Sequence, residues 1–349
     1  MNGHLEINGR LIGPGFPIYI VAELSANHNQ NFDQAVSLIY AAKKVDADAI
    51  KLQTYTPDTL TLRSDKEHFR VGDGLWAGRT LYDLYDAAYT PWEWQPELKA
   101  IANGLGMDLF STPFDTTAVE FLERMDVPAH KVASFEIVDL PLIRRIAQTG
   151  KPMIISTGMA TLAEIDEAVR TAREAGAMQI ALLKCNSAYP APPEEMHLHT
   201  IAHLAATFGV VAGLSDHTLG SAVPIAAVAL GACIIEKHLA FSREAPGPDN
   251  AFSLEPAEFR EMVNAIRIAE KALGEVRYEV TRQEAASRVF RRSLFVVEDM
   301  KAGDTFTAKT VRSIRPSYGL SPKHLPEVLG MRAAKDIERG TPLKWDLVI

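Results

Sequence analysis

Residues Gly213–His238 contain the pattern that decides the fold. They read Gly-Leu-Ser-Asp-His-Thr (213–218), an alanine-rich run, and then Gly-Ala-Cys-Ile-Ile-Glu-Lys-His (231–238). Val210–Leu214 and Ala232–Ile235 are short apolar runs typical of buried parallel strands, and Gly220–Leu230 has the length of a connecting helix. Both strands of such a unit end at the same edge of the sheet. The pattern therefore predicts that one strand end, with Ser215, Asp216 and His217, lies beside another, with Glu236 and His238.

This pair of strand ends is a candidate metal site. Alternation predicts that Glu236 and His238 share one face of their strand and that Lys237 lies on the other face. Two neutral imidazoles with nearby carboxylates suit Mn²⁺, Fe²⁺ or Zn²⁺. The alternative is that the histidines only form hydrogen bonds within a loop cluster. Spacing alone leaves both interpretations open.

Composition narrows the class of protein. The chain has 349 residues, 47% hydrophobic and 23% charged, as in an ordinary globular protein with room for a large and a small domain. A net charge of −8 argues against a nucleic-acid surface. The two cysteines, Cys185 and Cys233, predict buried free thiols in a reducing compartment. The sequence shows no secretory signal pattern and no run of membrane-spanning length, so we expect a cytoplasmic protein without a membrane partner.

The alternation of strand and helix patterns continues through residues 1–275. Further strands are expected at Ile18–Leu24, Ala49–Leu52, Met107–Phe110, His130–Ala133, Pro152–Ile155 and Gln179–Leu183. About eight strand–helix units in this length predict an α/β fold, a (β/α)₈ TIM barrel. The alternative is a doubly wound open sheet, but no strand is followed by a glycine-rich dinucleotide fingerprint.

Three segments depart from this alternation. Residues 1–17 predict an N-terminal hairpin around Asn8-Gly9 that closes one end of the barrel. Residues 55–94 predict a long loop rich in aromatic side chains, either a functional lid or a packed surface excursion. Residues 276–289 predict a linker, and residues 290–349 a small β-rich domain with little core of its own.

Polar side chains follow the predicted strands at the ends where barrel enzymes place their catalytic groups. They are Glu23, Lys51, Thr112, Lys131, Ser134, Ser156, Lys184, Ser187, Ser215, His217, Glu236 and His238. Amines supply charge and hydroxyls supply directional hydrogen bonds, so the set predicts a cradle for a phosphate or carboxylate. A metal beside it favours polarising a carbonyl or activating water. A Schiff-base aldolase using one lysine is the competing enzyme class.

Several ordered motifs resemble the sialic acid synthase family. They are Ala22-Glu-Leu-Ser-Ala-Asn-His-Asn29, Ser111-Thr-Pro-Phe-Asp115, Gly150-Lys-Pro-Met-Ile-Ile-Ser-Thr-Gly-Met-Ala160, Tyr189-Pro-Ala-Pro192, Ser215-Asp-His-Thr218 and Glu236-Lys-His238. The resemblance covers nearly the whole chain, and residues 290–349 resemble that family's antifreeze-like (SAF) domain.

The resemblance implies a reaction and roles for particular residues. Phosphoenolpyruvate would condense with the open-chain aldehyde of an N-acetylated amino sugar by C–O cleavage, giving a nine-carbon 2-keto acid and phosphate. His217 and His238 would bind Mn²⁺, with Mg²⁺ or Co²⁺ as alternatives, and Glu23 would orient the sugar or move a proton. Phosphoenolpyruvate would be held by Lys51, Thr112, Lys131, Ser134, Ser156, Ser187 and Ser215. The sugar would meet Glu23, Tyr189, Asp249, Phe135 and Arg315, the last supplied across a domain-swapped homodimer.

Within the family, the sequence resembles the pseudaminic acid synthases more than the N-acetylneuraminate synthases. Leu81-Tyr-Asp-Leu-Tyr85, Thr90-Pro-Trp-Glu-Trp94 and Ala133-Ser-Phe-Glu136 carry this resemblance. Phe135 and the aromatic loop would suit a deoxygenated sugar, because an apolar wall favours a methyl group over a hydroxyl. The implied substrate is 2,4-diacetamido-2,4,6-trideoxy-altrose (6-deoxy-AltdiNAc).

Two alternatives stay open at this point. One is an N-acetylneuraminate or legionaminic acid synthase, and the other is a non-catalytic sugar-binding relative. The complete set of lysine, serine, histidine and glutamate side chains argues against the second, since binding alone needs no paired-histidine metal site.

Overall fold

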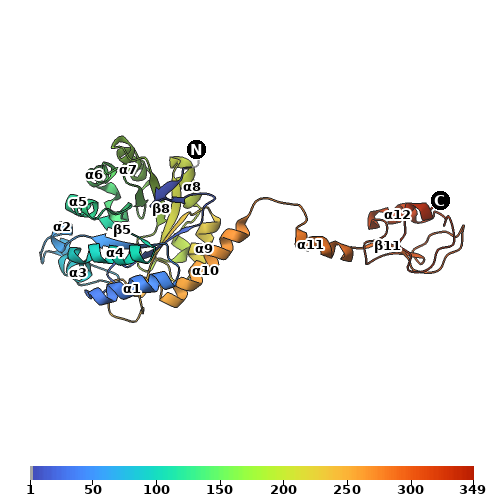
Figure 1. Cartoon of the computed structure of the whole chain (residues 1–349), viewed down its shortest axis with the longest axis horizontal. Coiled ribbons are helices and arrows are strands. Elements are labelled where there is room, and N and C mark those ends of the chain that lie inside the picture. The colour runs from blue at the N-terminus through green and yellow to red at the C-terminus, as the bar shows by residue number, and fades with distance from the viewer. Residues whose placement is uncertain (1–2) are drawn as a thin grey trace. The chain divides into compact units, whose positions relative to one another are not determined.

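Parallel strands close into a barrel in which each strand pairs with the next along the chain and β10 pairs with β3 (Figure 1). The computed structural model describes residues 3–349. The strands are β3 (Tyr19–Glu23), β4 (Ala49–Thr54), β5 (Asp108–Pro113), β6 (His130–Val132), β7 (Met153–Ser156), β8 (Ile180–Cys185), β9 (Val211–Asp216) and β10 (Ile234–His238). The predicted TIM barrel is confirmed.

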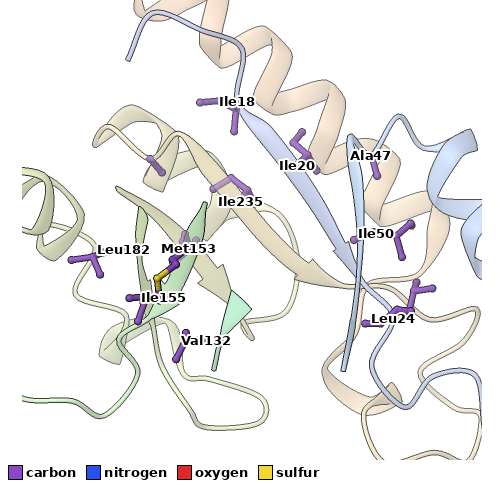
Figure 2. Close-up of a cluster of buried hydrophobic side chains, with 14 of the residues drawn as sticks. Ile18, Ile20, Leu24, Ala47, Ile50, Val132, Met153, Ile155, Leu182 and Ile235 are labelled. Atoms are coloured by element: carbon purple, nitrogen blue, oxygen red, sulfur yellow. The ribbon is translucent and has the colours of Figure 1, made fainter. Parts of the chain in front are cut away.

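A helix follows each barrel strand and packs on the outside. These helices are α1 (Phe32–Lys44), α4 (Gln95–Gly104), α5 (Thr116–Arg124), α6 (Leu140–Ala147), α7 (Leu162–Glu174), α8 (Thr200–Phe208), α9 (Ala222–Ala229) and α10 (Pro256–Leu273). Outward-facing strand residues such as Ile20, Ile50 and Ile155 are fully buried beneath them (Figure 2). Alternation along each strand therefore leaves the other face for the barrel interior.

The N-terminal hairpin fills the end of the barrel where the strands begin. It consists of β1 (Leu5–Ile7) paired with β2 (Arg10–Ile12). Leu5, Ile7 and Ile12 belong to one buried cluster with the first residues of several barrel strands, including Tyr19 and Ile234. Met1 and Asn2, which the predicted hairpin segment includes, lie outside the described residues. Ligands are thus confined to the opposite end, where the strands finish.

The segment 55–94 is more ordered than a long loop. It contains α2 (Pro57–Leu60) and α3 (Leu81–Ala88), so the prediction of an irregular loop was wrong over these residues. Helix α3 begins where the Thr80 hydroxyl accepts the backbone N–H of Asp83, a local cap that composition does not reveal. Helices α4 and α8 were not predicted either. Several strands also run one to three residues further than expected, because the barrel pairing extends into polar residues such as Ser111 and Thr112.

The chain divides after Gly274, and Glu275–Ile349 forms a second unit. This unit contains α11 (Arg282–Ser287), an antiparallel pair of β11 (Ser293–Val296) and β12 (Val311–Ile314), and α12 (Leu325–Val328). The expectation of little core was wrong. The unit has its own buried cluster, formed by Leu294, Val296, Met300, Phe306, Val311, Val328, Ala333, Ile337, Leu343 and Leu347. Within residues 3–349, no helix combines the length and apolar character needed to cross a membrane.

Candidate active site

The carboxyl ends of the barrel strands surround a cleft of about 400 Å³. The predicted residues that line it are Lys51, Lys131, Ser134, Phe135, Ser156, Tyr189, Ser215, His217, His238 and Asp249. Glu23 and Thr112 adjoin the cleft through their contacts with Lys51, and Ser187 adjoins it beside Ser134 and Gly158. Arg315 lies just after β12 in the second unit and is the one predicted site residue that belongs to that unit.

Two carboxylates and two ammonium groups alternate across the floor of the cleft. The Lys51 ammonium pairs with Glu23 and lies 3.5 Å from Oε1 of Glu236. The Lys131 ammonium lies 4.0 Å from Oε2 of the same Glu236. All four side chains are buried, and each comes from a different strand or neighbouring strand end, because parallel strands deliver their last residues to one edge. Glu236 therefore holds the two lysines together at the centre of the site.

Burial sets the protonation of these groups. Desolvation and the nearby Glu236 outweigh Lys51 and raise the pKa of Glu23 to about 7. Burial also opposes ionisation of Glu236, but Lys131 and Lys51 outweigh it and hold the pKa of Glu236 below its usual value. The pKa of Lys131 is lowered by burial. Glu236 is thus the resident anion, while Glu23 can exchange a proton near neutral pH.

Hydroxyl groups surround the two lysines. Lys51 donates to Oγ1 of Thr112 at 3.3 Å, and Lys131 donates to Oγ of Ser156 at 2.6 Å. Ser215 donates to Glu236 at 3.0 Å. The structure brings these predicted anion-binding residues together as one buried array, which a phosphate or carboxylate could satisfy.

Gly158 leaves the space that Ser134 and Ser187 face. A Cβ atom added there would lie 2.5 Å from Oγ of Ser134 and 2.7 Å from Oγ of Ser187, and Gly158 has a φ of +31°. Within the described chain, Oγ of Ser187 is buried without a hydrogen-bond partner. A glycine is therefore required where two hydroxyls converge beside the lysines.

The two histidines lie on the other side of the cleft, with ring centroids 5.3 Å apart. Nδ1 of His217 donates to the carbonyl of Asn186 at 2.7 Å, so in the neutral ring Nε2 carries the lone pair. Burial opposes protonation of this ring, but Cys185 and the Asn186 carbonyl outweigh burial and raise the pKa of His217. Nδ1 of His238 is buried without a partner among residues 3–349. Burial and neighbouring His217 hold the pKa of His238 well below its usual value, so this ring is neutral.

The two rings have the chemistry to bind a divalent ion, and His217 and His238 are the side chains that would hold one. The backbone contact of His217 is the kind of outer contact that orients metal-binding imidazoles. In the part of the chain that the structure describes, no group of three or more His, Cys, Asp or Glu side chains is arranged to hold a metal. A site with two histidines would have one protein ligand fewer than the usual catalytic zinc centre and would stay open to substrate.

Aromatic residues build the wall next to His217. Tyr189 packs on the imidazole with ring centroids 4.5 Å apart, and Trp76 packs on Tyr189 at 5.4 Å. The Trp76 indole donates to the carbonyl of Pro248 at 2.8 Å, next to Asp249. Trp76 and Pro248 also border a more open hollow of about 540 Å³ that contains none of the predicted site residues.

Sequence reasoning missed several residues of the cleft. Glu136 has a carboxyl oxygen, Oε2, that is buried without a partner among the described residues, and burial raises its pKa to about 7. Gln53 donates to Ser25, which in turn donates to Asp249. Alternation along β4 from Lys51 could have indicated Gln53, since both face the cleft.

An apolar wall was also missed, because most of it comes from α2 and α3 within the segment treated as a loop. It is formed by Leu60, Val71, Leu81, Leu84, Ala88 and Phe114, facing the cleft together with Phe135. Phe135 itself is 57% exposed, so its ring is open to the cleft rather than packed in the core.

Comparison with known proteins identifies the family of this chain. The NeuB family model matches residues 38–278, and the SAF domain model matches residues 291–349. The chain is 47% identical to the pseudaminic acid synthase of Campylobacter jejuni subsp. jejuni serotype O:23/36 (strain 81-176), covering 94% of this chain and 95% of the relative. It is 44% identical to that of Helicobacter pylori (strain ATCC 700392 / 26695), covering 95% and 97%.

A solved structure extends the likeness to the fold. N-acetylneuraminic acid (sialic acid) synthetase from Leptospira borgpetersenii serovar Hardjo-bovis, in complex with citrate, superposes with a TM-score of 0.73 at 28% identity. The match covers 82% of this chain and 95% of that structure. Together with the family models, these matches show that the chain belongs to the NeuB family, the sialic acid synthase family of phosphoenolpyruvate-dependent condensing enzymes.

Proposed function

We propose that this enzyme condenses phosphoenolpyruvate with 6-deoxy-AltdiNAc to form pseudaminic acid, a nine-carbon 2-keto acid, and phosphate. A C–C bond forms between C3 of phosphoenolpyruvate and the aldehyde carbon of the sugar. Water adds at C2, and the bond from C2 to the phosphate oxygen breaks. The observation that carries the proposal is a buried lysine and hydroxyl cradle facing a histidine pair and an apolar wall in one cleft.

The cradle suits the two anionic ends of phosphoenolpyruvate. Lys51 and Lys131 supply the positive charge, and Thr112, Ser134, Ser156, Ser187 and Ser215 supply hydroxyl groups. Their ion pairs with Glu236 keep both ammonium groups in place before substrate arrives. Such preorganised charge needs little rearrangement during the reaction.

Glu23 is the group we propose for proton transfer or sugar orientation. With a pKa raised to about 7, the carboxyl is present in both protonation states near neutral pH. Its ion pair with Lys51 places it next to the cradle. Glu136, with a pKa also raised to about 7, is a second candidate on the sugar side of the cleft.

His217 and His238 would hold the divalent ion, which we propose is Mn²⁺, with Mg²⁺ or Co²⁺ as alternatives. The fit rests on Nδ1 of His238, which has no partner among the described residues, and on the hydrogen bond from His217 to Asn186, which orients the His217 ring. When bound, such an ion polarises a carbonyl oxygen and lowers the pKa of bound water. The chain itself orients the two rings and keeps His238 neutral.

The sugar preference rests on the side chains opposite the cradle. Phe135 and the apolar wall offer a surface for the C6 methyl group, whereas a hydroxyl there would lose its hydrogen bonds to water. Tyr189 and Asp249 line the same cavity and offer polar contacts to the sugar. The names of the relatives that are 44–47% identical agree with this preference.

We also propose a domain-swapped homodimer in which Arg315 reaches a partner's cleft. Residues 1–274 contain 22 Lys and Arg against 34 Asp and Glu, whereas Glu275–Ile349 contains 14 against 10. The opposite charges of the two units favour association. Val276, Tyr278 and Val280 are 88%, 96% and 41% exposed at every second position, which suits a strand-like segment that docks on another chain.

The two free, buried thiols support a reducing, cytoplasmic setting.

Phosphate release from phosphoenolpyruvate with Mn²⁺ tests the proposal. We expect release with 6-deoxy-AltdiNAc and little with N-acetylmannosamine or the legionaminic-type diacetamido sugar. Release with either of those instead would keep the reaction and replace the substrate, making the chain an N-acetylneuraminate or legionaminic acid synthase. Release with none would favour a non-catalytic sugar-binding relative.

A further inference from the structure

A cluster of buried polar side chains lies behind the two histidines, on the face of β9 and β10 that does not line the cleft. It consists of Asp216, Thr218 and Lys237, which are at most 1% exposed. Ser215 and Glu236, their neighbours in sequence, face the cleft, so alternation directs Asp216 and Lys237 away from it. The proposed condensation uses none of these three residues.

Hydrogen bonds close the cluster around His217. The Lys237 ammonium lies 2.5 Å from Oδ2 of Asp216 and also donates to the carbonyl of Thr218. Asp216 in turn accepts the Thr218 backbone N–H at 3.0 Å and its hydroxyl at 3.1 Å. Both residues that flank His217 are therefore bonded to Lys237, the residue that precedes His238.

The bonds from Lys237 to Asp216 and Thr218, called the tie below, connect the strand ends that carry the two histidines. Lys237 lies opposite Asp216 in the parallel register of β10 and β9. Each histidine is one residue further along its strand, toward the cleft. The tie therefore fixes how far each imidazole extends past the end of the barrel, relative to the other.

A buried ion pair is not needed for stability alone. Removing two charges from water opposes folding, and well-packed apolar side chains often replace such a pair without loss of stability. Ion pairs retained in a core can instead specify one arrangement of the chain. Here the residues that the pair arranges are the two histidines.

We propose that Lys237, through its bonds to Asp216 and Thr218, is a positioning residue that holds the His217 and His238 imidazoles at the spacing for one divalent ion. The inference rests on the proposed function, since it takes the two histidines as the metal-binding pair. It adds an outer tie that acts on both ligands at once, in the way that outer hydrogen bonds tune metal sites.

The double variant Asp216→Asn/Lys237→Met tests this role. Methionine keeps the length of the lysine stem, and asparagine still accepts the Thr218 N–H, so the turn around His217 stays while the tie to β10 is lost. Neither change leaves an unpaired buried charge. Mn²⁺ affinity of the metal-free protein is measured by calorimetric titration, beside phosphoenolpyruvate affinity and the melting temperature. The matched control is Asp48→Asn/Arg267→Met, which removes a 3.1 Å ion pair at the opposite end of the barrel, together with the pairs of Asp48 with Arg10 and of Arg267 with Glu270.

We expect the double variant to lose about 10- to 100-fold in Mn²⁺ affinity, with phosphoenolpyruvate affinity and melting temperature close to those of the parent. The control should keep the parent Mn²⁺ affinity. Equal Mn²⁺ binding by parent and double variant would overturn the positioning role alone. A parent that binds no Mn²⁺, or still binds it after His217→Ala, would overturn the metal site of the proposed function as well.

Discussion

Two carboxyl groups of the cleft, those of Glu23 and Glu136, have pKa values raised to about 7 by burial. Such groups change charge in the range where enzymes operate, and perturbed carboxyl groups cluster at functional sites. They contrast with Glu236, which two lysines keep ionised. One cleft thus holds a permanent anion and two carboxyl groups that exchange protons near neutral pH.

Glu136 should make stability fall as the pH rises. Its folded pKa of about 7 exceeds the usual value of 4.5, so folding is favoured most below pH 4.5 and this contribution is lost as the pH approaches 7. Glu136→Gln should therefore raise the free energy of unfolding at pH 8 by about 3 kcal/mol and change it little at pH 4.5. Urea unfolding at both pH values measures the difference.

Glu123 provides the control with opposite sign. Burial opposes its ionisation, but hydrogen bonds and charges from His130 and Lys151 outweigh this and lower its pKa. Its contribution is present above the unfolded pKa and is lost as the pH falls. Glu123→Gln should thus lower stability at pH 8, and a parallel pH profile for the two variants would contradict this account.

Phe135 should select the sugar. Phe135→Gly removes part of the apolar wall, so kcat/KM for 6-deoxy-AltdiNAc should fall about 10- to 100-fold, the usual effect of losing apolar contacts to one methyl group. The fall should be smaller for N-acetylmannosamine, in steady-state assays with both sugars. Val138→Ala is the control, because Val138 is 58% exposed and lies outside the cleft lining. Equal losses for both sugars would rule out a selective role.

At the scale of elements, the two ends of the barrel differ: one is filled by a buried apolar hairpin and the other carries the polar side chains of the cleft. The hairpin of β1 and β2 seals the end where the strands begin, and the reactive side chains gather where they finish. Helices α2 and α3 are inserted between β4 and α4 and supply much of the apolar wall. The insertion thus places apolar side chains in the same cleft as the cradle that the strands provide.

The hairpin should contribute to stability without affecting activity. Ile7 is fully buried, so Ile7→Ala should lower the free energy of unfolding by about 3 kcal/mol through lost burial and an unfilled cavity. Urea unfolding measures this, and kcat/KM should stay at the parent value. Glu6→Ala, at an exposed position of the same strand, should change stability by less than about 0.5 kcal/mol. A large loss of activity in Ile7→Ala would show that the two ends are coupled.

At the scale of the whole molecule, charge and exposed apolar residues differ between the two units. The first unit is acidic and the second is basic, and the segment that joins them exposes Val276, Tyr278 and Val280. Tyrosines this exposed are frequent anchors of interfaces, because they bury a large area with few rotatable bonds. These features are the reason for including the linker in the proposed dimer interface.

Replacing the linker side chains should weaken the proposed dimer. Val276→Ser/Tyr278→Ser/Val280→Ser removes the apolar face, and we expect at least a tenfold higher dissociation constant by sedimentation velocity. Met178→Ser is the control, since Met178 is 90% exposed on the barrel. A parent that sediments as a monomer at every concentration would exclude the dimer, and an unchanged constant in the triple variant would exclude the linker's role.

The sequence by itself determined the barrel, the second domain and the strand ends that carry chemistry. Strand and helix periods act over a few neighbouring residues, and parallel strands must place their last residues at one edge, so Lys51, Lys131, His217 and His238 could be assigned to one site. Helix α4 and the helices inside segment 55–94 could not be assigned, because short helices depend on caps and packing more than on pattern.

Only the tertiary structure decided which carboxyl groups have raised pKa values, which side chains form the apolar wall, and which residues pair behind the histidines. Burial in the folded chain raises the pKa of Glu136, and the apolar wall combines side chains of α2 and α3 with Val71 and Phe114. The tie from Lys237 to Asp216 depends on register between two strands rather than on either motif alone. Desolvation and register are set by all the neighbours of a group at once, and local sequence records only those next to it along the chain.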